Sequence, residues 1–249
     1  MTSEHFRPPL NYAPGNSLFG RMLFFLRRFG DLQIASIRQH LDGWLRNRQG
    51  QVLEIGCGDQ PYRHLIPMNC EYCGLDWVHS KKIFGYGKPD TIYYDGEIFP
   101  FSDNKFDALF HSEVMEHVYA VETFLSECHR VLKPDGEIAI TVPFQARYHF
   151  IPHDYWRFTA ACLDKLLKEA GFEKIIIIPR GNDVSVMGYK VLSVIYRLLF
   201  GCWKEKLLGA VLMPLGLLAL MIVHTSLLFP GLGSPDDCLG YVVFGRKKI

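Results

Sequence analysis

Two acidic residues and a histidine follow one apolar segment and could hold a divalent ion or move a proton. The sequence Glu113-Val114-Met115-Glu116-His117 comes directly after the apolar run of residues 106–111. If this segment is helical, its two carboxylates and its imidazole stand three and four positions apart and share one face. Carboxylate and imidazole donors bind divalent metals, and an imidazole can also act as a general base.

A glycine turn follows an earlier apolar strand. Residues 52–55 run directly into Gly56-Cys57-Gly58, where glycine lets the backbone turn tightly and approach a ligand. A dinucleotide site normally has a third glycine at the position of Pro61, which weighs against a nicotinamide-dependent enzyme. A plain tight turn is the alternative interpretation.

Two aspartates end the next two strands. Asp76, followed by Trp77, ends the strand expected over residues 72–76, and its carboxylate can accept two hydrogen bonds from a ribose diol. Asp95 ends the strand expected over residues 91–94, and an adenine ring and its amine could lie beside Asp95 and Gly96.

Strand and helix patterns alternate along the chain, which predicts a parallel sheet covered by helices. Strands are expected over residues 51–55, 72–76, 91–94, 106–111, 137–142, 174–179 and 239–246. Helical spacing covers residues 17–28, 32–46 and 118–132, and Thr159 can cap a helix that ends at Gly171.

Over residues 50–180 this order of motifs resembles the class I S-adenosylmethionine-dependent methyltransferases, particularly those of the ubiquinone and menaquinone pathways. The resemblance implies a Rossmann-like seven-stranded sheet with its last strand antiparallel and helices on both faces. It also implies that the glycine turn lines the methionine part of the cofactor and that the end of the fourth strand borders the sulfonium. The expected cofactor-binding residues are Glu54, Gly56, Cys57, Gly58, Asp76, Trp77, Asp95, Gly96, His111 and Ser112.

The acidic segment is similar to the E-x-x-E-H metal site of small-RNA 2′-O-methyltransferases and ubiquinone O-methyltransferases. A later histidine completes the site in the RNA enzymes, and His153 is the best candidate here, with His149 next. The expected metal ligands are Glu113, Glu116, His117 and His153. Two alternatives stay open: Glu116 and His117 are framework residues of the wider family, or His117 or His153 is a metal-free catalytic base.

The acceptor is expected to be a sugar, a lipid-linked molecule or another small hydroxylated compound, methylated on oxygen. Pro61-Tyr62-Arg63 and residues 153–159 are similar to a bacterial subgroup often linked to surface-glycan assembly. The aromatic residues of the second segment could form a substrate wall or a packed turn, and Arg157 could bind an acidic group or pair with Asp154. A non-catalytic methyltransferase-like scaffold is the alternative function.

The composition of the chain bears on its binding partners and on its cellular compartment. The 249 residues carry a formal charge of +1, so no basic excess indicates a nucleic-acid partner. The seven cysteines are scattered, the pair Cys70 and Cys73 lacks a second pair for zinc, and no signal-peptide pattern opens the chain. We expect reduced thiols and a cytoplasmic protein.

An uncharged apolar segment, residues 207–223, lies between the last two expected strands. Both strands must be on one side of any membrane to share a sheet, so a single crossing is excluded. The segment is expected either to lie on the membrane surface, at its inner face, or to pack in a hydrophobic helical hairpin. A cover over the sheet or a homodimer contact is the alternative. The expected organisation is an N-terminal arm with helices (1–48), a methyltransferase core (49–180 and 238–249) and an apolar insertion (181–237).

Overall fold

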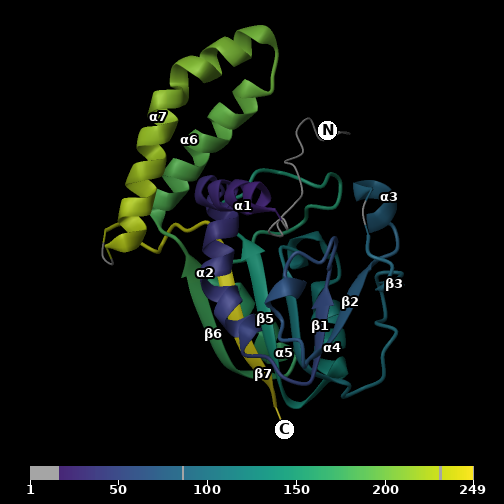
Figure 1. Cartoon of the computed structure of the whole chain (residues 1–249). Coiled ribbons are helices and arrows are strands. Elements are labelled where there is room, and N and C mark those ends of the chain that lie inside the picture. The colour runs from purple at the N-terminus through teal and green to yellow at the C-terminus, as the bar shows by residue number, and fades with distance from the viewer. Residues whose placement is uncertain (1–16, 86, 230–231, 249) are drawn as a thin grey trace.

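The computed structural model describes residues 17–85, 87–229 and 232–248, so the arm expected over residues 1–16 lies outside the described residues. A seven-stranded sheet carries helices on both faces (Figure 1). The strands are β1 Gln51–Ile55, β2 Glu71–Trp77, β3 Thr91–Tyr94, β4 Phe106–Ser112, β5 Leu132–Pro143, β6 Phe172–Arg180 and β7 Gly240–Lys247. The helices are α1 Leu18–Gly30, α2 Leu32–Arg46, α3 Ser80–Phe84, α4 Val121–Val131, α5 Ala160–Glu169, α6 Asp183–Leu199 and α7 Trp203–Leu228, with short 3₁₀ turns η1 Arg63–Leu65 and η2 Met115–His117.

The strand order is β3-β2-β1-β4-β5-β7-β6. Strands β1 to β5 pair in parallel, whereas β7 is antiparallel to both β5 and β6, which confirms the expected sheet. Because β7 separates β5 from β6 and opposes both, β6 runs parallel to β5. The carboxyl ends of β1 to β6 therefore lie along one edge.

The two faces of the sheet have separate cores. Helix α2 packs Leu41 and Leu45 with Val52, Phe110 and Ala139 on one face. On the other face, α4 and α5 contact the sheet residues that alternate with these, which are Leu53, Leu109, Ile138 and Ile140. This alternation is the period of two of a strand with both faces covered.

The structure departs from the expected elements at one turn. Residues 134–136, expected to be a turn, lie within β5, where its pairing with β4 shifts register and Asp135 has a φ of 64°. A bulge of this kind keeps a strand continuous while bending it. The expected cap of α5 is present, because the Thr159 hydroxyl accepts a hydrogen bond from the amide of Cys162.

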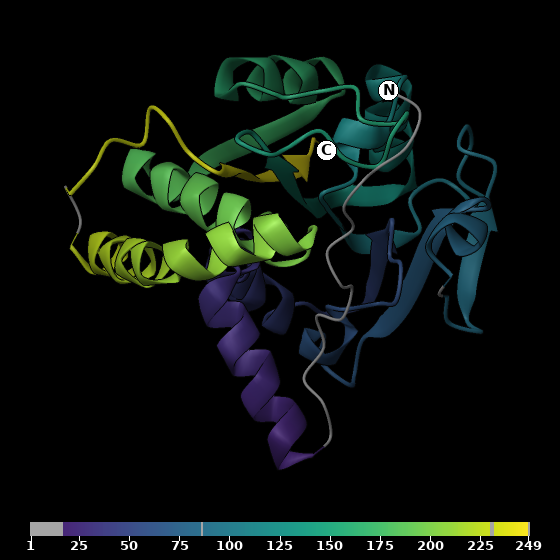
Figure 2. The same ribbon diagram turned by 90° about the horizontal axis from the view of Figure 1, so that it is seen from above.

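Helices α6 and α7 form a hairpin between β6 and β7 that projects from the body of the molecule (Figure 1). Seen from above, the two helices lie side by side, and α1 extends away from them (Figure 2). Val186, Val223 and Leu32 pack together with Leu239 at the base of the hairpin. The hairpin starts where β6 ends, so it leaves the sheet at the edge formed by the carboxyl ends of the strands.

Candidate active site

Four of the expected site residues lie along one edge of the sheet. Gly56 follows β1, and Asp76, Asp95 and Ser112 lie at the ends of β2, β3 and β4. These strands are neighbours in the sheet, so the four positions are adjacent. In open α/β sheets, ligands bind outside the carboxyl ends of the strands, where the strand order reverses, which here is between β1 and β4.

The glycine turn after β1 is tied to the end of β2. Gly56 and Gly58 have φ of 66° and 51°, a region that favours glycine. A Cβ at Gly56 would lie 2.4 Å from Cγ2 of Val114, so the turn leaves no space for a side chain there. The amide of Gly58 donates to Oδ2 of Asp76 at 3.0 Å, which positions the carboxylate beside the turn.

Asp76 is a buried carboxylate with remaining hydrogen-bonding capacity. It is 8% exposed, and its Oδ1 accepts the amide of Trp77 at 2.7 Å. Burial raises the pKa of Asp76, and the bonds from Trp77 and Gly58 oppose that rise. The Ser80 hydroxyl is a third donor to this carboxylate. Because a carboxylate has about four acceptor sites, a site remains for a ligand hydroxyl.

Glu54 lies buried at the same edge, and this burial favours its protonated form. It is 3% exposed, and the Tyr72 hydroxyl donates to its Oε2 at 2.5 Å. Burial raises the pKa of Glu54 to about 8, and the bond from Tyr72 lowers the pKa only in part. A cationic ligand group nearby would favour its ionised form.

The end of β3 is the solvent-exposed part of this edge of the sheet. Asp95 and Gly96 are exposed, and Trp77 Nε1 donates to the carbonyl of Asp95 at 3.2 Å. Oδ1 of Asp95 accepts the amide of Glu97 at 3.0 Å. Cys57, by contrast, is buried beneath the turn with its Sγ 3.8 Å from Oγ1 of Thr91, so its side chain faces inward.

His111 is buried at the end of β4. Neither ring nitrogen has a hydrogen-bond partner among the described residues, and the ring meets Phe124 edge-on at 5.2 Å. Burial lowers the pKa of His111 to about 3, so the ring is neutral. Ser112 Oγ lies 3.2 Å from the Tyr62 hydroxyl and 2.8 Å from that of Thr141, contacts that the sequence did not indicate.

The helical face expected for Glu113, Glu116 and His117 is not formed. Glu113 has a φ of 56°, and only residues 115–117 form a single 3₁₀ turn. Oε1 of Glu113 instead accepts hydrogen bonds from Arg180 Nη2 and from the Thr141 hydroxyl, both at 2.9 Å. The carboxylate of Glu113, which is partly exposed, therefore pairs with the buried Arg180 and does not belong to the candidate ligand group.

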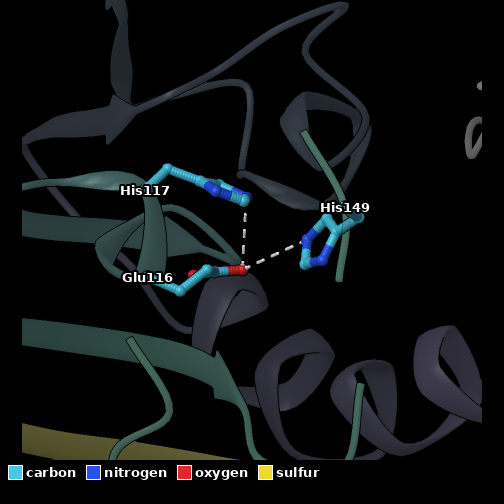
Figure 3. A group of neighbouring side chains, drawn as sticks. All are labelled: Glu116, His117 and His149. Carbon is cyan, nitrogen blue, oxygen red and sulfur yellow. Dashed lines mark ion pairs between the residues drawn. The ribbon is translucent and has the colours of Figure 1, made fainter. Parts of the chain in front are cut away.

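Among the described residues, the group that could hold a metal ion consists of Glu116, His117 and His149 (Figure 3). Glu116 is completely buried, and neither of its carboxylate oxygens has a hydrogen-bond partner in the described part of the chain. Its Oε1 lies 3.6 Å from Nε2 of His117 and 3.9 Å from Nε2 of His149. Burial raises the pKa of Glu116 well above its ordinary value.

Backbone carbonyls orient both imidazoles toward Glu116. Nδ1 of His117 lies 2.8 Å from the carbonyl oxygen of His153, and Nδ1 of His149 lies 2.9 Å from that of Arg147. Since a carbonyl can only accept, each Nδ1 carries the proton and each Nε2 presents its lone pair to Glu116. Burial, with His149 next in effect, lowers the pKa of His117 to about 4.

His153, the preferred histidine from the sequence, lies beside the cluster rather than in it. Its Nδ1 is 3.1 Å from the Tyr155 hydroxyl, and its ring lies 5.3 Å from that of Trp77, edge-on. His149, the second choice, takes the ligand position because the loop between β5 and α5 returns over η2. Arg157 forms a two-bond pair with Asp154, at 2.6 and 2.8 Å, which settles its partner.

The aromatic segment before α5 is partly a wall and partly a packed turn. Tyr155 and Trp156 are about two-fifths exposed, whereas Phe158 is buried. The backbone amides of Tyr155 and Trp156 donate to the carbonyl of Glu116, and Trp156 Nε1 donates to that of Val118. This segment therefore holds η2 in place while it leaves two aromatic rings at the surface.

Comparisons with known proteins agree with this arrangement. Residues 53–140 match a family model described as a methyltransferase domain. The chain is 30% identical over 132 residues to a probable S-adenosylmethionine-dependent methyltransferase of Mycolicibacterium smegmatis, covering 49% of this chain and 51% of that protein. It is 32% identical over 135 residues to the human mitochondrial ubiquinone biosynthesis O-methyltransferase, covering 47% of this chain and 37% of that protein.

The fold is also similar to that of a solved structure. A putative sarcosine dimethylglycine methyltransferase from Galdieria sulphuraria aligns with a TM-score of 0.53 and 21% identity, covering 92% of this chain and 88% of that chain. This chain spans about half of the Mycolicibacterium protein and less of the human one. The strand order, the glycine turn at the switch point and these matches together support a class I S-adenosylmethionine-dependent methyltransferase domain, whose family model matches residues 53–140.

Proposed function

We propose that the protein transfers a methyl group from S-adenosylmethionine to a hydroxyl of a sugar, a lipid-linked molecule or another small acceptor. The observation that supports a hydroxylated acceptor is the cluster of Glu116, His117 and His149, which follows β4 at the proposed cofactor-binding edge of the sheet. The sulfonium is already a strong electrophile, so the protein mainly aligns donor and acceptor. A hydroxyl nucleophile additionally needs a base or a metal, and this cluster can supply either.

In this proposal, different residues at the edge of the sheet contact different parts of the cofactor. Asp76 accepts hydrogen bonds from the ribose, and Trp77, Asp95 and Gly96 border the adenine. The turn residues Gly56, Cys57 and Gly58, with Glu54, surround the methionine part, whose amino group favours the ionised form of Glu54. His111 and Ser112 border the sulfonium. The protonated state of Glu54 predicts that cofactor binding releases a proton near neutral pH.

The cluster fits a divalent metal ion. Two imidazole lone pairs and a buried carboxylate without hydrogen-bond donors are a donor set suited to such an ion. A bound ion would polarise the acceptor hydroxyl and favour its deprotonation. Without an ion, the proposed base is His117, because the bond of its Nδ1 to the His153 carbonyl leaves Nε2 unprotonated. His153 lies farther out, beside Trp77, where it could contact the acceptor.

Chelation distinguishes these two mechanisms. If an ion is used, methyl transfer to a hydroxylated acceptor should fall in chelator and return with a divalent metal, and His149→Asn should mimic the chelator. The matched control is His64→Asn, which alters an exposed histidine of η1 outside the ligand group. Full activity in chelator, with no metal bound in equilibrium dialysis, would leave only the base mechanism.

The second candidate function is a non-catalytic scaffold with the same fold. Titration calorimetry with S-adenosylmethionine separates the two, since an enzyme must bind the cofactor and a scaffold need not. The intact glycine turn and buried Asp76 support binding. We also propose a cytoplasmic location at the inner face of a membrane, supported by the exposed apolar hairpin, with a homodimer as the competing explanation for that surface.

A further inference from the structure

Helix α7 is apolar on nearly every side, yet it is mostly exposed. It is the single helix in the described part of the chain that is long and apolar enough to cross a membrane, and only 17% of its most apolar stretch is buried. Of its buried positions, Gly209, Gly216 and Val223 recur every seven residues and form one narrow stripe, and Ser226 is also buried near the end of the helix. Its exposed large apolar side chains are Trp203, Leu207, Leu208, Val211, Met213, Leu215, Leu217, Leu218, Met221 and Ile222.

That stripe is the contact with α6. A Cβ at Gly188 would lie 2.2 Å from Val223, one at Gly216 would lie 2.9 Å from Ile195, and one at Gly209 would lie 3.1 Å from the backbone of Leu199. Small residues that let two helices approach closely are typical of helix pairs in membranes. The hairpin therefore completes its own packing through glycine and leaves the other sides of α7 uncovered.

The distribution of these side chains favours lipid over a protein partner. A helix that is apolar all round is either buried in a core or surrounded by lipid. A second copy of the chain would cover one side of the helix, whereas acyl chains can cover all exposed sides at once.

Helix α1 extends the apolar surface at the base of the hairpin. The Phe29 ring stacks on His224 of α7 at 3.9 Å, and His224 Nε2 lies 2.9 Å from the Phe29 carbonyl oxygen. Exposed apolar side chains along α1 are Leu18, Phe19, Met22, Leu23, Phe25, Leu26 and Phe29. The sequence of α1 contains three arginines and no acidic residue, as suits anionic headgroups.

We propose that the α6–α7 hairpin and α1 together dock on an anionic lipid bilayer and insert into one leaflet. Strand β6 precedes the hairpin in the sequence and β7 follows it, and the two strands pair in one sheet. Both must therefore lie on the same side of a membrane, so the hairpin cannot cross it an odd number of times. Two crossings would place Lys190 in the hydrocarbon, since it is exposed at the middle of α6. Lys190 and Arg197 are seven residues apart on one side of α6 and can reach headgroups from a shallow position.

Docking in this way brings the candidate active site to the bilayer. The hairpin leaves the sheet at the carboxyl ends of the strands (Figure 1). Gly56, Asp76 and Ser112 lie at the same ends of β1, β2 and β4. An acceptor whose hydroxylated head is held in the headgroup region by a lipid chain would face this edge. The membrane inference itself does not depend on the identity of the acceptor.

Vesicle flotation of the full chain tests the proposal. The wild type should float with vesicles of phosphatidylcholine and phosphatidylglycerol, and less with phosphatidylcholine alone or at high salt. Val211→Glu with Leu218→Glu, both on exposed positions of α7, should weaken partitioning roughly tenfold or more. The matched control is Met68→Glu, an equally drastic change at a fully exposed residue on the body of the molecule.

Folding and oligomeric state are measured on the same samples. Circular dichroism and S-adenosylmethionine binding should be equal in all three proteins, which separates failure of docking from failure of the proposed function. Absence of flotation of the wild type with the anionic vesicles would overturn the proposal. A second result would also overturn it. If light scattering without lipid shows that the wild type is a dimer and the α7 variant a monomer, and neither protein floats, then a second copy of the chain covers the helix.

Discussion

At the scale of residues, the site depends on how burial changes the charge state of its polar groups. Glu54 and Glu116 are buried carboxyl groups whose pKa values are raised, and His111 and His117 are buried imidazoles whose pKa values are lowered. Each shift favours the neutral form, because burial removes the hydration of the charged one. Burial therefore favours the neutral forms of these four groups, and a cationic cofactor beside Glu54 would favour its ionised form instead.

The role of Asp76 is tested by its removal. Asp76→Ala should weaken S-adenosylmethionine binding by about 1–3 kcal/mol, because charge-assisted hydrogen bonds to the ribose are lost. Calorimetry measures the change, and Glu71→Ala, at the opposite end of the same strand, is the control. Unchanged affinity in a folded Asp76→Ala protein would refute the ribose assignment.

The protonation of Glu54 predicts a pH-dependent stability difference. Since its pKa rises from 4.5 to about 8 on folding, its contribution is fully present below about pH 4.5 and is lost as the pH rises through about 8. Glu54→Gln mimics the protonated form and should escape this loss. The free energy of unfolding of the wild type should fall relative to the variant by at most about 1.4 kcal/mol per pH unit in this range. Urea denaturation at about pH 5 and about pH 8.5 measures it, and a pH-independent difference would contradict the assignment.

At the scale of elements, the loop between β5 and α5 builds the cluster. It supplies His149 and donates two backbone amides to the carbonyl of Glu116, so that η2 and the loop are one unit. The loop ends at Thr159, which caps α5. The start of α5 is therefore an anchor for the candidate ligands.

Loss of that cap should weaken the anchor modestly. Thr159→Ala should lower the free energy of unfolding by about 1 kcal/mol, because the Cys162 amide loses its acceptor. Thr159→Ser retains the hydroxyl and should lose much less, as thermal or urea unfolding can measure. Equal losses in both variants would assign the effect to the methyl group rather than the cap.

At the scale of the whole molecule, one buried cation joins elements that are distant in sequence. Arg180, at the end of β6, is fully buried and donates to Glu113, to the carbonyl of Val142 in β5 and to that of Gln33 in α2. The hairpin begins three residues later. Arg180 thus links the site edge, α2 and the origin of the hairpin.

Removal of one partner of this ion pair should be costly. Arg180→Met should destabilise the fold by about 1–3 kcal/mol, because the Glu113 carboxylate and the buried carbonyl of Val142 lose their donor. Arg246→Ala, which breaks half-exposed pairs with Asp135 and Glu137, should cost below about 1 kcal/mol. Equal destabilisation of the two variants in urea would contradict a special role for Arg180.

The sequence by itself determined the sheet and the edge at which we expect the cofactor to bind. Strands β1 and β3 and helix α2 have the bounds that their apolar spacing predicts, because each element must bury one repeating pattern of side chains. The glycine turn and the aspartates at the ends of β2 and β3 could also be predicted, because each follows an apolar strand. Their position after a strand places them at one edge in any parallel sheet.

Only the tertiary structure decided which polar groups meet. Glu113 stands close to Glu116 in the sequence, yet its left-handed backbone turns its carboxylate to Arg180, a residue 67 positions away. His149 rather than His153 faces Glu116, since the path of the loop and not the spacing sets that contact. The one feature of the sequence that indicated a role for Arg180 was its position as a charged residue at the end of a β-branched strand. Side-chain partners depend on loop paths and on burial, which local periodicity does not encode.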